Sequence, residues 1–141
     1  MNEASETSDL HVARCSCGGL SVTVVGAPVR INACSCNDCQ RRSGSAFTYT
    51  AFYLDAAVRG ISGVYRLWRE IRDAGRWHDT GFCPTCGVAV FCRLEAIPDT
   101  IGIAVGTLND PGFAAPENFY WITRRHHWLP LPEGIGRLER Q

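Results

Sequence analysis

The sequence contains no lysine, and all 14 of its basic residues are arginine. They are balanced by 14 acidic residues, so the formal net charge at pH 7 is zero. A chain without excess positive charge gives no reason to expect nucleic acid or an anionic membrane surface as its partner. The sequence also lacks any apolar run near the roughly 18 residues that a membrane span requires. We therefore expect neither nucleic acid nor a membrane as a partner.

The N-terminal segment lacks the features of a secretory signal. Residues 1–9 are polar, with acidic side chains at Glu3, Glu6 and Asp9, and contain neither a basic stretch nor an apolar one. We expect residues 1–10 to form a disordered tail and residues 11–141 to form a single domain. We also expect a cytoplasmic location, where thiols stay reduced.

No long amphipathic helical pattern occurs, and the apolar residues instead favour short strands separated by Gly, Pro, Asn and Asp. This pattern predicts an all-β domain of several coiled antiparallel sheets. One short helical turn is predicted at residues 37–43, with Ser35 or Asn37 as its cap and Gly44 at its end. The six candidate strands cover residues 20–24, 46–54, 63–71, 88–94, 100–105 and 119–123.

Eight cysteines are present, and seven of them form three tight clusters. In a reducing compartment, clustered cysteines indicate metal or redox chemistry more than disulfides. A closed structural zinc site takes four protein ligands, whereas a working site usually takes three and keeps one position open. The clusters comprise Cys15 and Cys17, then Cys34, Cys36 and Cys39, and last Cys83 and Cys86, so seven thiols predict two zinc ions per chain.

The first and last clusters have matching designs. Cys15-Ser16-Cys17-Gly18 and Cys83-Pro84-Thr85-Cys86-Gly87 each offer two thiolates on a turn followed by glycine, and each needs two more ligands. The simplest solution pairs them around one structural zinc. Such a site would staple two distant parts of the chain, and its binding energy would count as folding energy.

The middle cluster brings three thiols within six residues. Three thiolates leave one position of a tetrahedral zinc free, and that position suits another thiolate because zinc accepts soft sulfur readily. We therefore expect Cys34, Cys36 and Cys39 to hold a catalytic zinc that acts on a small thiol. Arg41 and Arg42, next to this cluster, are the best candidates for binding the carboxylates of that thiol.

Other arrangements stay open at this point. Cys15 and Cys17 could share a metal with two residues of the middle cluster. The middle cluster could also be a second closed site completed by Cys92 or a histidine, or a redox triad without metal. We expect Cys92 to be a small buried apolar residue. We expect the four histidines, His78 among them, to be solvated.

The motifs together resemble one family, the glutathione-dependent formaldehyde-activating enzymes, also called the centromere-protein-V family. The stretches that carry the resemblance are Cys15-Ser16-Cys17-Gly18, residues 34–47 (CSCNDCQRRSGSAF) and Phe82-Cys83-Pro84-Thr85-Cys86-Gly87. Downstream, Gly106-Thr107-Leu108-Asn109-Asp110 and Trp128 are similar to further family segments. The match runs from about residue 14 to residue 136.

The resemblance implies a zinc-stabilised fold of coiled sheets. It also implies structural zinc on Cys15, Cys17, Cys83 and Cys86, and catalytic zinc on the middle three cysteines. The implied reaction joins glutathione and formaldehyde into S-(hydroxymethyl)glutathione, as a carbon–sulfur lyase running in reverse. Two departures concern the substrate: Phe119 stands where members often carry His, and residues 76–81 lack the Arg usually found two residues before Phe82.

The expected function is therefore a zinc-dependent carbon–sulfur lyase-type enzyme acting on an adduct of an aldehyde with glutathione or a related small thiol. The alternative is a non-enzymatic module in which both zinc ions are structural and a surface loop binds a protein partner. Both readings predict two zinc ions, so metal content alone does not separate them.

Overall fold

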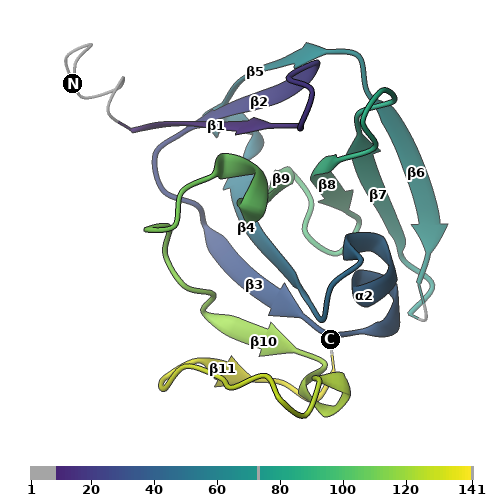
Figure 1. Cartoon of the computed structure of the whole chain (residues 1–141), viewed down its shortest axis with the longest axis vertical. Helices are drawn as coiled ribbons and strands as arrows, with labels where there is room; N and C mark the ends of the chain where they lie inside the picture. Colours follow the sequence, from purple (N-terminus) through teal and green to yellow (C-terminus); the bar gives the residue numbers. More distant parts are fainter. Residues whose placement is uncertain (1–8, 73, 141) are drawn as a thin grey trace.

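The computed structural model describes residues 9–72 and 74–140. Its described part contains two open β-sheets and one α-helix (Figure 1). The smaller sheet has three antiparallel strands in the order β1-β2-β5. These strands are β1 (Leu10–Arg14), β2 (Leu20–Val25) and β5 (Val58–Gly63).

The larger sheet has eight strands in the order β11-β10-β3-β4-β9-β8-β7-β6. They are β3 (Arg30–Cys34), β4 (Thr48–Leu54), β6 (Arg66–Ile71), β7 (Trp77–Phe82), β8 (Ala89–Leu94), β9 (Thr100–Ala104), β10 (Asn118–Tyr120) and β11 (Gly136–Arg137). Most neighbours are antiparallel, but β10 runs parallel to both β3 and β11. Three 3₁₀ turns also occur: η1 (Asp55–Ala57), η2 (Val105–Leu108) and η3 (Ile122–Arg124).

The predicted all-β class is confirmed. Strand β2 shows the alternation of apolar and polar residues on which the prediction relied. Leu20, Val22 and Val24 are fully buried, whereas the residues between them are half-buried. Alternate residues of a strand point to opposite faces, so this one face packs into the main core. The core lies between the two sheets and also contains Tyr53, Val90, Ile101 and Ile103 from β4, β8 and β9.

The predicted helix is confirmed as α2 (Asn37–Ser43), but its cap was predicted wrongly. Cys36 is the N-cap, and its Sγ accepts a hydrogen bond from the Cys39 amide at 3.3 Å. Ser35 is instead fully buried and donates to the Ala46 carbonyl at 3.0 Å. Gly44 ends the helix as expected, with a left-handed φ of 63° that glycine adopts without strain.

The strand predictions missed β1, β3, β7 and β11, and one predicted segment, residues 63–71, joined the last residue of β5 to β6. The predicted disordered tail, residues 1–10, lies outside the described residues except for its last two, of which Leu10 opens β1. Among the described residues, no helix is long and apolar enough to cross a membrane.

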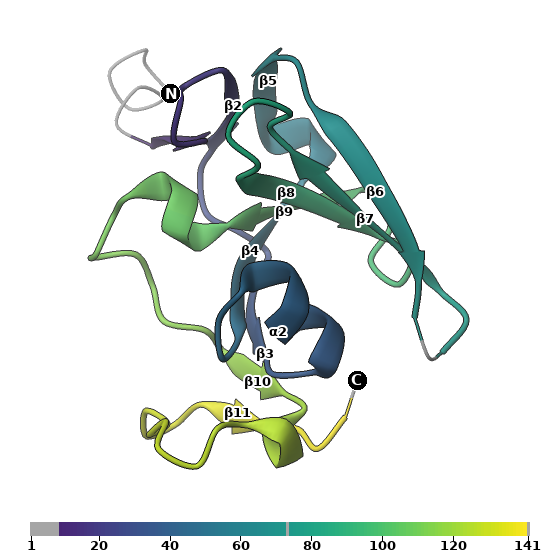
Figure 2. The same ribbon diagram turned by 45° about the vertical axis from the view of Figure 1, so that its right-hand side comes forward.

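The large sheet curves around α2, so strands from both of its ends lie near this helix. Figures 1 and 2 show α2 beside β3 and β4, with the β6–β7 hairpin across from it. Arg42 of α2 touches His78 and Thr80 of β7, which confirms that helix and hairpin meet. This junction between α2, β3 and the β6–β7 hairpin holds the middle cysteine cluster.

Candidate metal centres and active site

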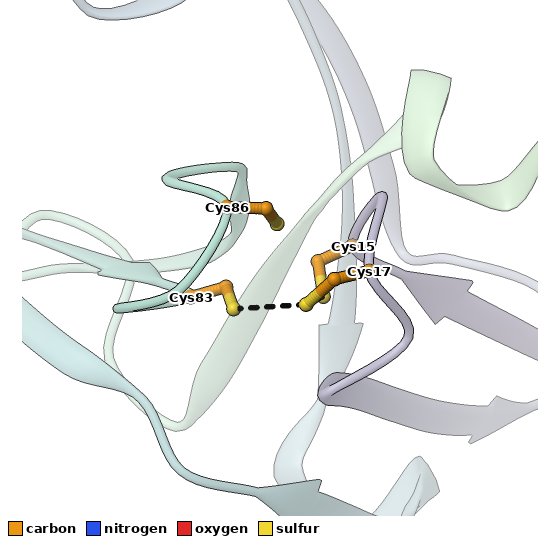
Figure 3. A group of neighbouring side chains, drawn as sticks. All are labelled: Cys15, Cys17, Cys83 and Cys86. Atoms are coloured by element: carbon orange, nitrogen blue, oxygen red, sulfur yellow. Dashed lines mark hydrogen bonds between the residues drawn. The ribbon is translucent and has the colours of Figure 1, made fainter.

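Four cysteines from two turns converge on one point between the sheets. Cys15 and Cys17 come from the β1–β2 turn and Cys83 and Cys86 from the β7–β8 turn (Figure 3). Their sulfur atoms all lie within 4.8 Å of one another. The Cys15–Cys17 and Cys17–Cys83 sulfur distances are both 3.6 Å. Four thiolates around a tetrahedral zinc, with Zn–S near 2.3 Å, sit about 3.8 Å apart, so this cluster fits that metal.

Backbone N–H groups donate hydrogen bonds to these sulfurs and so stabilise negative charge on them. Leu20 N–H donates to Cys15 Sγ at 3.2 Å, and Thr85 N–H donates to Cys83 Sγ at 3.4 Å. The backbone amides of Val88 and Cys17 lower the pKa of Cys86 to about 6. The turns can aim their amides inward because Gly18 and Gly87 take left-handed φ angles of 76° and 80°. The pKa of Cys17 is instead raised to about 11: the Gly19 amide lowers it, but the neighbouring thiols of Cys83 and Cys15 outweigh that effect. The cluster therefore favours the thiolate, the form that binds metal, at some of its sulfurs, and a cation would be needed to ionise all four.

The second cluster consists of Cys34, Cys36 and Cys39, at the end of β3 and the start of α2. All three side chains are buried, and their sulfurs also lie within 4.8 Å of one another. Cys36 N–H donates to Cys34 Sγ at 3.5 Å. Tyr120 and Trp121 pack against the cluster from β10 and the residue after it. The structure thus groups the seven clustered cysteines as four and three.

Three adjacent buried thiols cannot all ionise without a cation. Hydrogen bonds from the thiols of Cys34 and Cys36 lower the pKa of Cys39. The pKa of Cys34 is raised by its thiol partners Cys36 and Cys39 and by burial. One thiolate forms readily and the others resist, because each further negative charge is repelled by the first. A divalent metal would replace the missing protons, so this donor set fits zinc as well.

No fourth metal-binding side chain completes the cluster of three in the described part of the chain. The group contains only these three cysteines, with no histidine, carboxylate or further cysteine inside the same 4.8 Å limit. Cys92 is buried, as predicted, and lines a cavity beside Cys34 and Cys39 without joining the group. A metal held here would keep a coordination position open to a ligand from outside.

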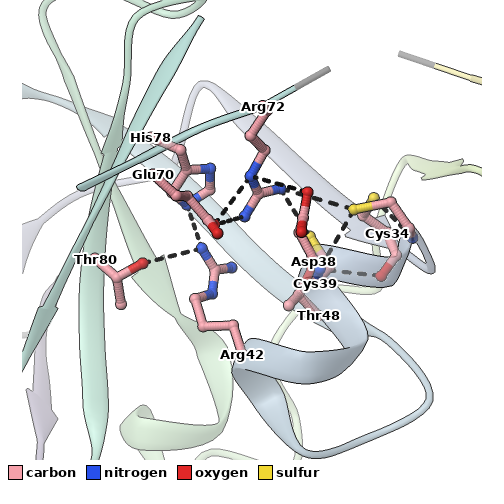
Figure 4. A network of polar contacts seen from close by, with 10 residues as sticks. Cys34, Asp38, Cys39, Arg42, Thr48, Glu70, Arg72, His78 and Thr80 are labelled. Atoms are coloured by element: carbon pink, nitrogen blue, oxygen red, sulfur yellow. Dashed lines mark hydrogen bonds and ion pairs between the residues drawn. The ribbon is translucent and has the colours of Figure 1, made fainter. Parts of the chain in front are cut away.

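Arg72, which the sequence did not single out, reaches the cluster from the end of the β6–β7 hairpin. Its Nη1 donates to Cys39 Sγ at 3.5 Å and to Cys36 Sγ at 3.7 Å (Figure 4). The same guanidinium forms an ion pair with Glu70 at 2.6 Å and lies 3.9 Å from Asp38. Its side chain is only 14% exposed, so its charge acts on the sulfurs with little solvent screening.

The adjacent arginines Arg41 and Arg42 point in different directions. Successive helix residues are turned by about 100°, so Arg41 is exposed, whereas Arg42 turns toward β7. Arg42 contacts His78 Nε2 and donates to Thr80 Oγ1 at 3.3 Å (Figure 4). His78 is buried rather than solvated, which contradicts the expectation for it. Burial and the charges of Arg42 and Arg72 lower the pKa of His78 to about 3, so it is neutral at pH 7.

Two cavities adjoin the cluster of three. The larger, of about 460 Å³, is lined by Cys36, Arg41, Arg72 and Trp121, and by Arg124 and Arg140 of the C-terminal segment. The smaller, of about 150 Å³, is lined by Cys34, Cys39, Arg42 and Arg72, with Asn32 and Thr50 on its sheet side. Arg41 and Arg42 therefore line different cavities, which are neighbours that share Arg72, Arg76 and His78 among their lining residues.

Comparison with known proteins identifies the family of this chain. Residues 10–124 match the family model of the glutathione-dependent formaldehyde-activating enzyme. The chain belongs to this family. No curated protein matches it. A Rhodobacter sphaeroides protein of known crystal structure is similar in fold, with a TM-score of 0.54 and 21% sequence identity; the match covers 73% of this chain and 90% of that chain.

One family departure has a simple structural role. Phe119, where members of the glutathione-dependent formaldehyde-activating family often carry histidine, is buried in β10. Its ring lies 5.8 Å from the ring of Phe47. The aromatic pair packs β10 against the segment that follows α2. This position therefore offers no group that could move a proton or bind a metal.

Replacing Arg72 with glutamine should weaken activity and metal binding by about tenfold to 100-fold, the range seen for outer-shell partners of metal sites. The reason is that two sulfurs lose a cationic donor while the fold keeps its core. Activity and zinc affinity would measure the loss, and the thiolate-to-metal absorption of cobalt-substituted protein should shift. Arg69→Gln is the matched control: Arg69 belongs to the same hairpin, but pairs with Asp79 at 2.7 Å and not with the sulfurs. Equal effects of the two substitutions would contradict the role given to Arg72.

Proposed function

We propose that the protein is a zinc-dependent carbon–sulfur lyase-type enzyme that forms and cleaves an adduct between glutathione, or a related small thiol, and an aldehyde. The observation that carries this proposal is the cluster of Cys34, Cys36 and Cys39, which offers three metal ligands, has no fourth among the described residues, and has cavities beside it. Family membership supports the same chemistry. The four-cysteine cluster would hold a second, structural zinc.

The larger cavity is the proposed thiol site. Its volume of about 460 Å³ lies within the roughly 300–1,000 Å³ of pockets that hold small molecules. Glutathione carries two carboxylates, and guanidinium groups bind carboxylates in two-pronged fashion. Arg41, Arg124 and Arg140 line this cavity. The guanidiniums of Arg124 and Arg140 lie 4.6 Å and 5.9 Å from the ring centre of Trp121, which limits their freedom.

The chain's own groups would position the thiol at the cluster. When bound, zinc would keep a thiol ionised near neutral pH. Carboxylates held in the large cavity would place the sulfur beside Cys36, and much of the rate gain would come from this proximity. Arg72 would offset the negative charge of several thiolates at one point. A reducing compartment such as the cytoplasm is part of the proposal, because every one of these cysteines has to remain a free thiol.

A titration with glutathione tests the proposal directly. Cobalt would replace zinc, and the thiolate-to-cobalt absorption would be followed as glutathione is added. We expect this absorption to intensify with glutathione and to stay unchanged with S-methylglutathione, which has the same carboxylates but no free thiol. If glutathione leaves the thiolate-to-cobalt absorption unchanged, the thiol does not bind the metal. That result would contradict the proposed mechanism and favour a module with two structural zinc ions.

A further inference from the structure

The smaller cavity does not suit a one-carbon aldehyde. Its volume of about 150 Å³ is ten times the roughly 10–15 Å³ that one water needs, and formaldehyde has only two heavy atoms. The cavity is also far smaller than the neighbouring one, so it cannot hold a tripeptide. Because Cys34 and Cys39 line it, a molecule in this cavity would face the same sulfurs as a thiol bound on the Cys36 side.

Apart from the cluster sulfurs, the ionised side chains that line this cavity are all basic. Arg30, Arg42, Arg72 and Arg76 line it, and none of the described residues around it is acidic. Arg72 already has Glu70, Asp38 and the sulfurs as partners. Within the described chain, no carboxylate pairs with the other three. A neutral aldehyde can accept hydrogen bonds from a guanidinium group only through its carbonyl oxygen, whereas a carboxylate gains charge-assisted, two-pronged hydrogen bonds as well.

Arg42 is the most informative of these arginines. It is half-buried, and its contacts in the described structure are the neutral His78 and Thr80 rather than an acid (Figure 4). Two neutral acceptors hold the guanidinium in place, and its charge helps to lower the pKa of Cys39. Because no carboxylate of the described chain pairs with Arg42, an anionic ligand in the cavity would gain a charge-assisted hydrogen bond from it.

The sheet side of the cavity offers hydrogen bonds. Asn32 of β3 and Thr50 of β4 are register partners and both line the cavity. The Oδ1 atom of Asn32 is buried and has no hydrogen-bond partner among the described residues. An unpaired buried acceptor costs free energy. Because this atom is closed to solvent, a hydroxyl group on a molecule in the cavity would supply the missing donor only once the Asn32 side chain turns toward the cavity.

From these observations we infer that the smaller cavity is the carbonyl subsite and that it takes a small aldehyde or 2-oxo acid, a carbonyl compound carrying its own carboxylate. This inference rests on the proposed thiol chemistry. The thiol sulfur forms a bond to the carbonyl carbon, the C=O π electrons move to oxygen, and the proton released by the thiol ends on that oxygen. The product is a hydroxy thioether with its carboxylate on Arg42 and Arg30 and its hydroxyl on the Asn32 side of the cavity. The reverse reaction restores the thiol and the carbonyl acid.

Adduct formation tests the substrate class. Exchange between free and thiol-bound carbonyl compound would be measured by NMR with zinc-loaded protein, using glyoxylate, the uncharged methylglyoxal, and formaldehyde. We expect kcat/KM to be about tenfold or more higher for glyoxylate than for either neutral aldehyde, the worth of a charge-assisted hydrogen bond. Arg42→Gln and the surface variant Arg30→Gln should each remove this preference. Arg59→Gln, distant from both cavities, should keep it.

Binding without chemistry separates this inference from the proposed function. Oxamate, an unreactive carbonyl acid, would be titrated calorimetrically into zinc-loaded protein without thiol, and we expect it to bind and to weaken about tenfold in Arg42→Gln and Arg30→Gln. If oxamate binds in this way but no thiol adduct forms with any carbonyl, the subsite stands and the lyase proposal fails. If formaldehyde is used, glyoxylate is not preferred and oxamate does not bind, the lyase proposal stands and the subsite is overturned. Displacement of oxamate by S-methylglutathione would also overturn it, because the arginines would then hold the thiol substrate's carboxylates.

Discussion

Replacing Cys83 with serine should leave the chain largely unfolded at room temperature. The four-cysteine cluster joins the turn of the three-stranded sheet to a turn of the eight-stranded sheet, across 66 residues of sequence. A structural zinc contributes on the order of 10–16 kcal/mol to such sites, and a whole domain is stable by only about 5–15 kcal/mol. Serine does not ionise near neutral pH and is a poor zinc ligand. Loss of one ligand therefore removes an amount of free energy comparable to the total.

Circular dichroism and zinc analysis would measure this effect. We expect Cys83→Ser to lose the cooperative thermal transition and to retain less zinc than the wild type, and a strong chelator should do the same to the wild-type protein. The matched control is Cys92→Ala, at a buried cysteine outside both clusters, where a loss of about 1–2 kcal/mol is expected. A folded Cys83→Ser protein with two bound zinc ions would refute the structural role of the cluster.

The grouping of the cysteines was predictable only in part from local pattern. Spacings of two and three residues on tight turns bring the thiols of each sequence cluster together, whereas the pairing of Cys15 and Cys17 with Cys83 and Cys86 spans 66 residues and was one of the arrangements left open. The helix at residues 37–43 was equally local, since Gly44 ends it by its own conformation. Its cap was not predictable in the same way, because Cys36 serves both as the cap and as a member of the cluster.

The surroundings of the cluster depend on contacts between distant segments. Arg72 reaches Cys39 across 33 residues and Arg42 reaches His78 across 36, through the docking of the β6–β7 hairpin onto α2. No single segment of sequence contains that docking. The adjacent positions of Arg41 and Arg42 suggested one shared task, whereas the helical turn between them sends each to a different cavity. The sequence therefore indicated which cysteines could hold metal, but not the cavities that surround the cluster of three.

Replacing Cys39 with serine should abolish activity while the protein stays folded. Cys39 is a buried member of the cluster of three and accepts a hydrogen bond from Arg72. Without its thiolate, only two ligands remain for the proposed catalytic zinc, so activity should fall by more than the roughly 10–100-fold typical of outer-shell changes. The four-cysteine cluster is untouched, because the two groups share no residue. The expected cost in stability is that of an ordinary buried substitution, about 1–2 kcal/mol.

Zinc content, thermal melting and activity together test this prediction: one zinc should remain, the melting temperature should fall by only a few degrees, and activity should be lost. Cys36→Ser sharpens the test, because serine is a good N-cap and can replace the Cys36 sulfur as acceptor for the Cys39 amide. That variant should lose activity with an even smaller change in stability, which separates the thiolate from the helix cap. Collapse of the fold in both variants would mean that the second cluster is structural too, and retained activity in either would show that the reaction does not need all three thiolates.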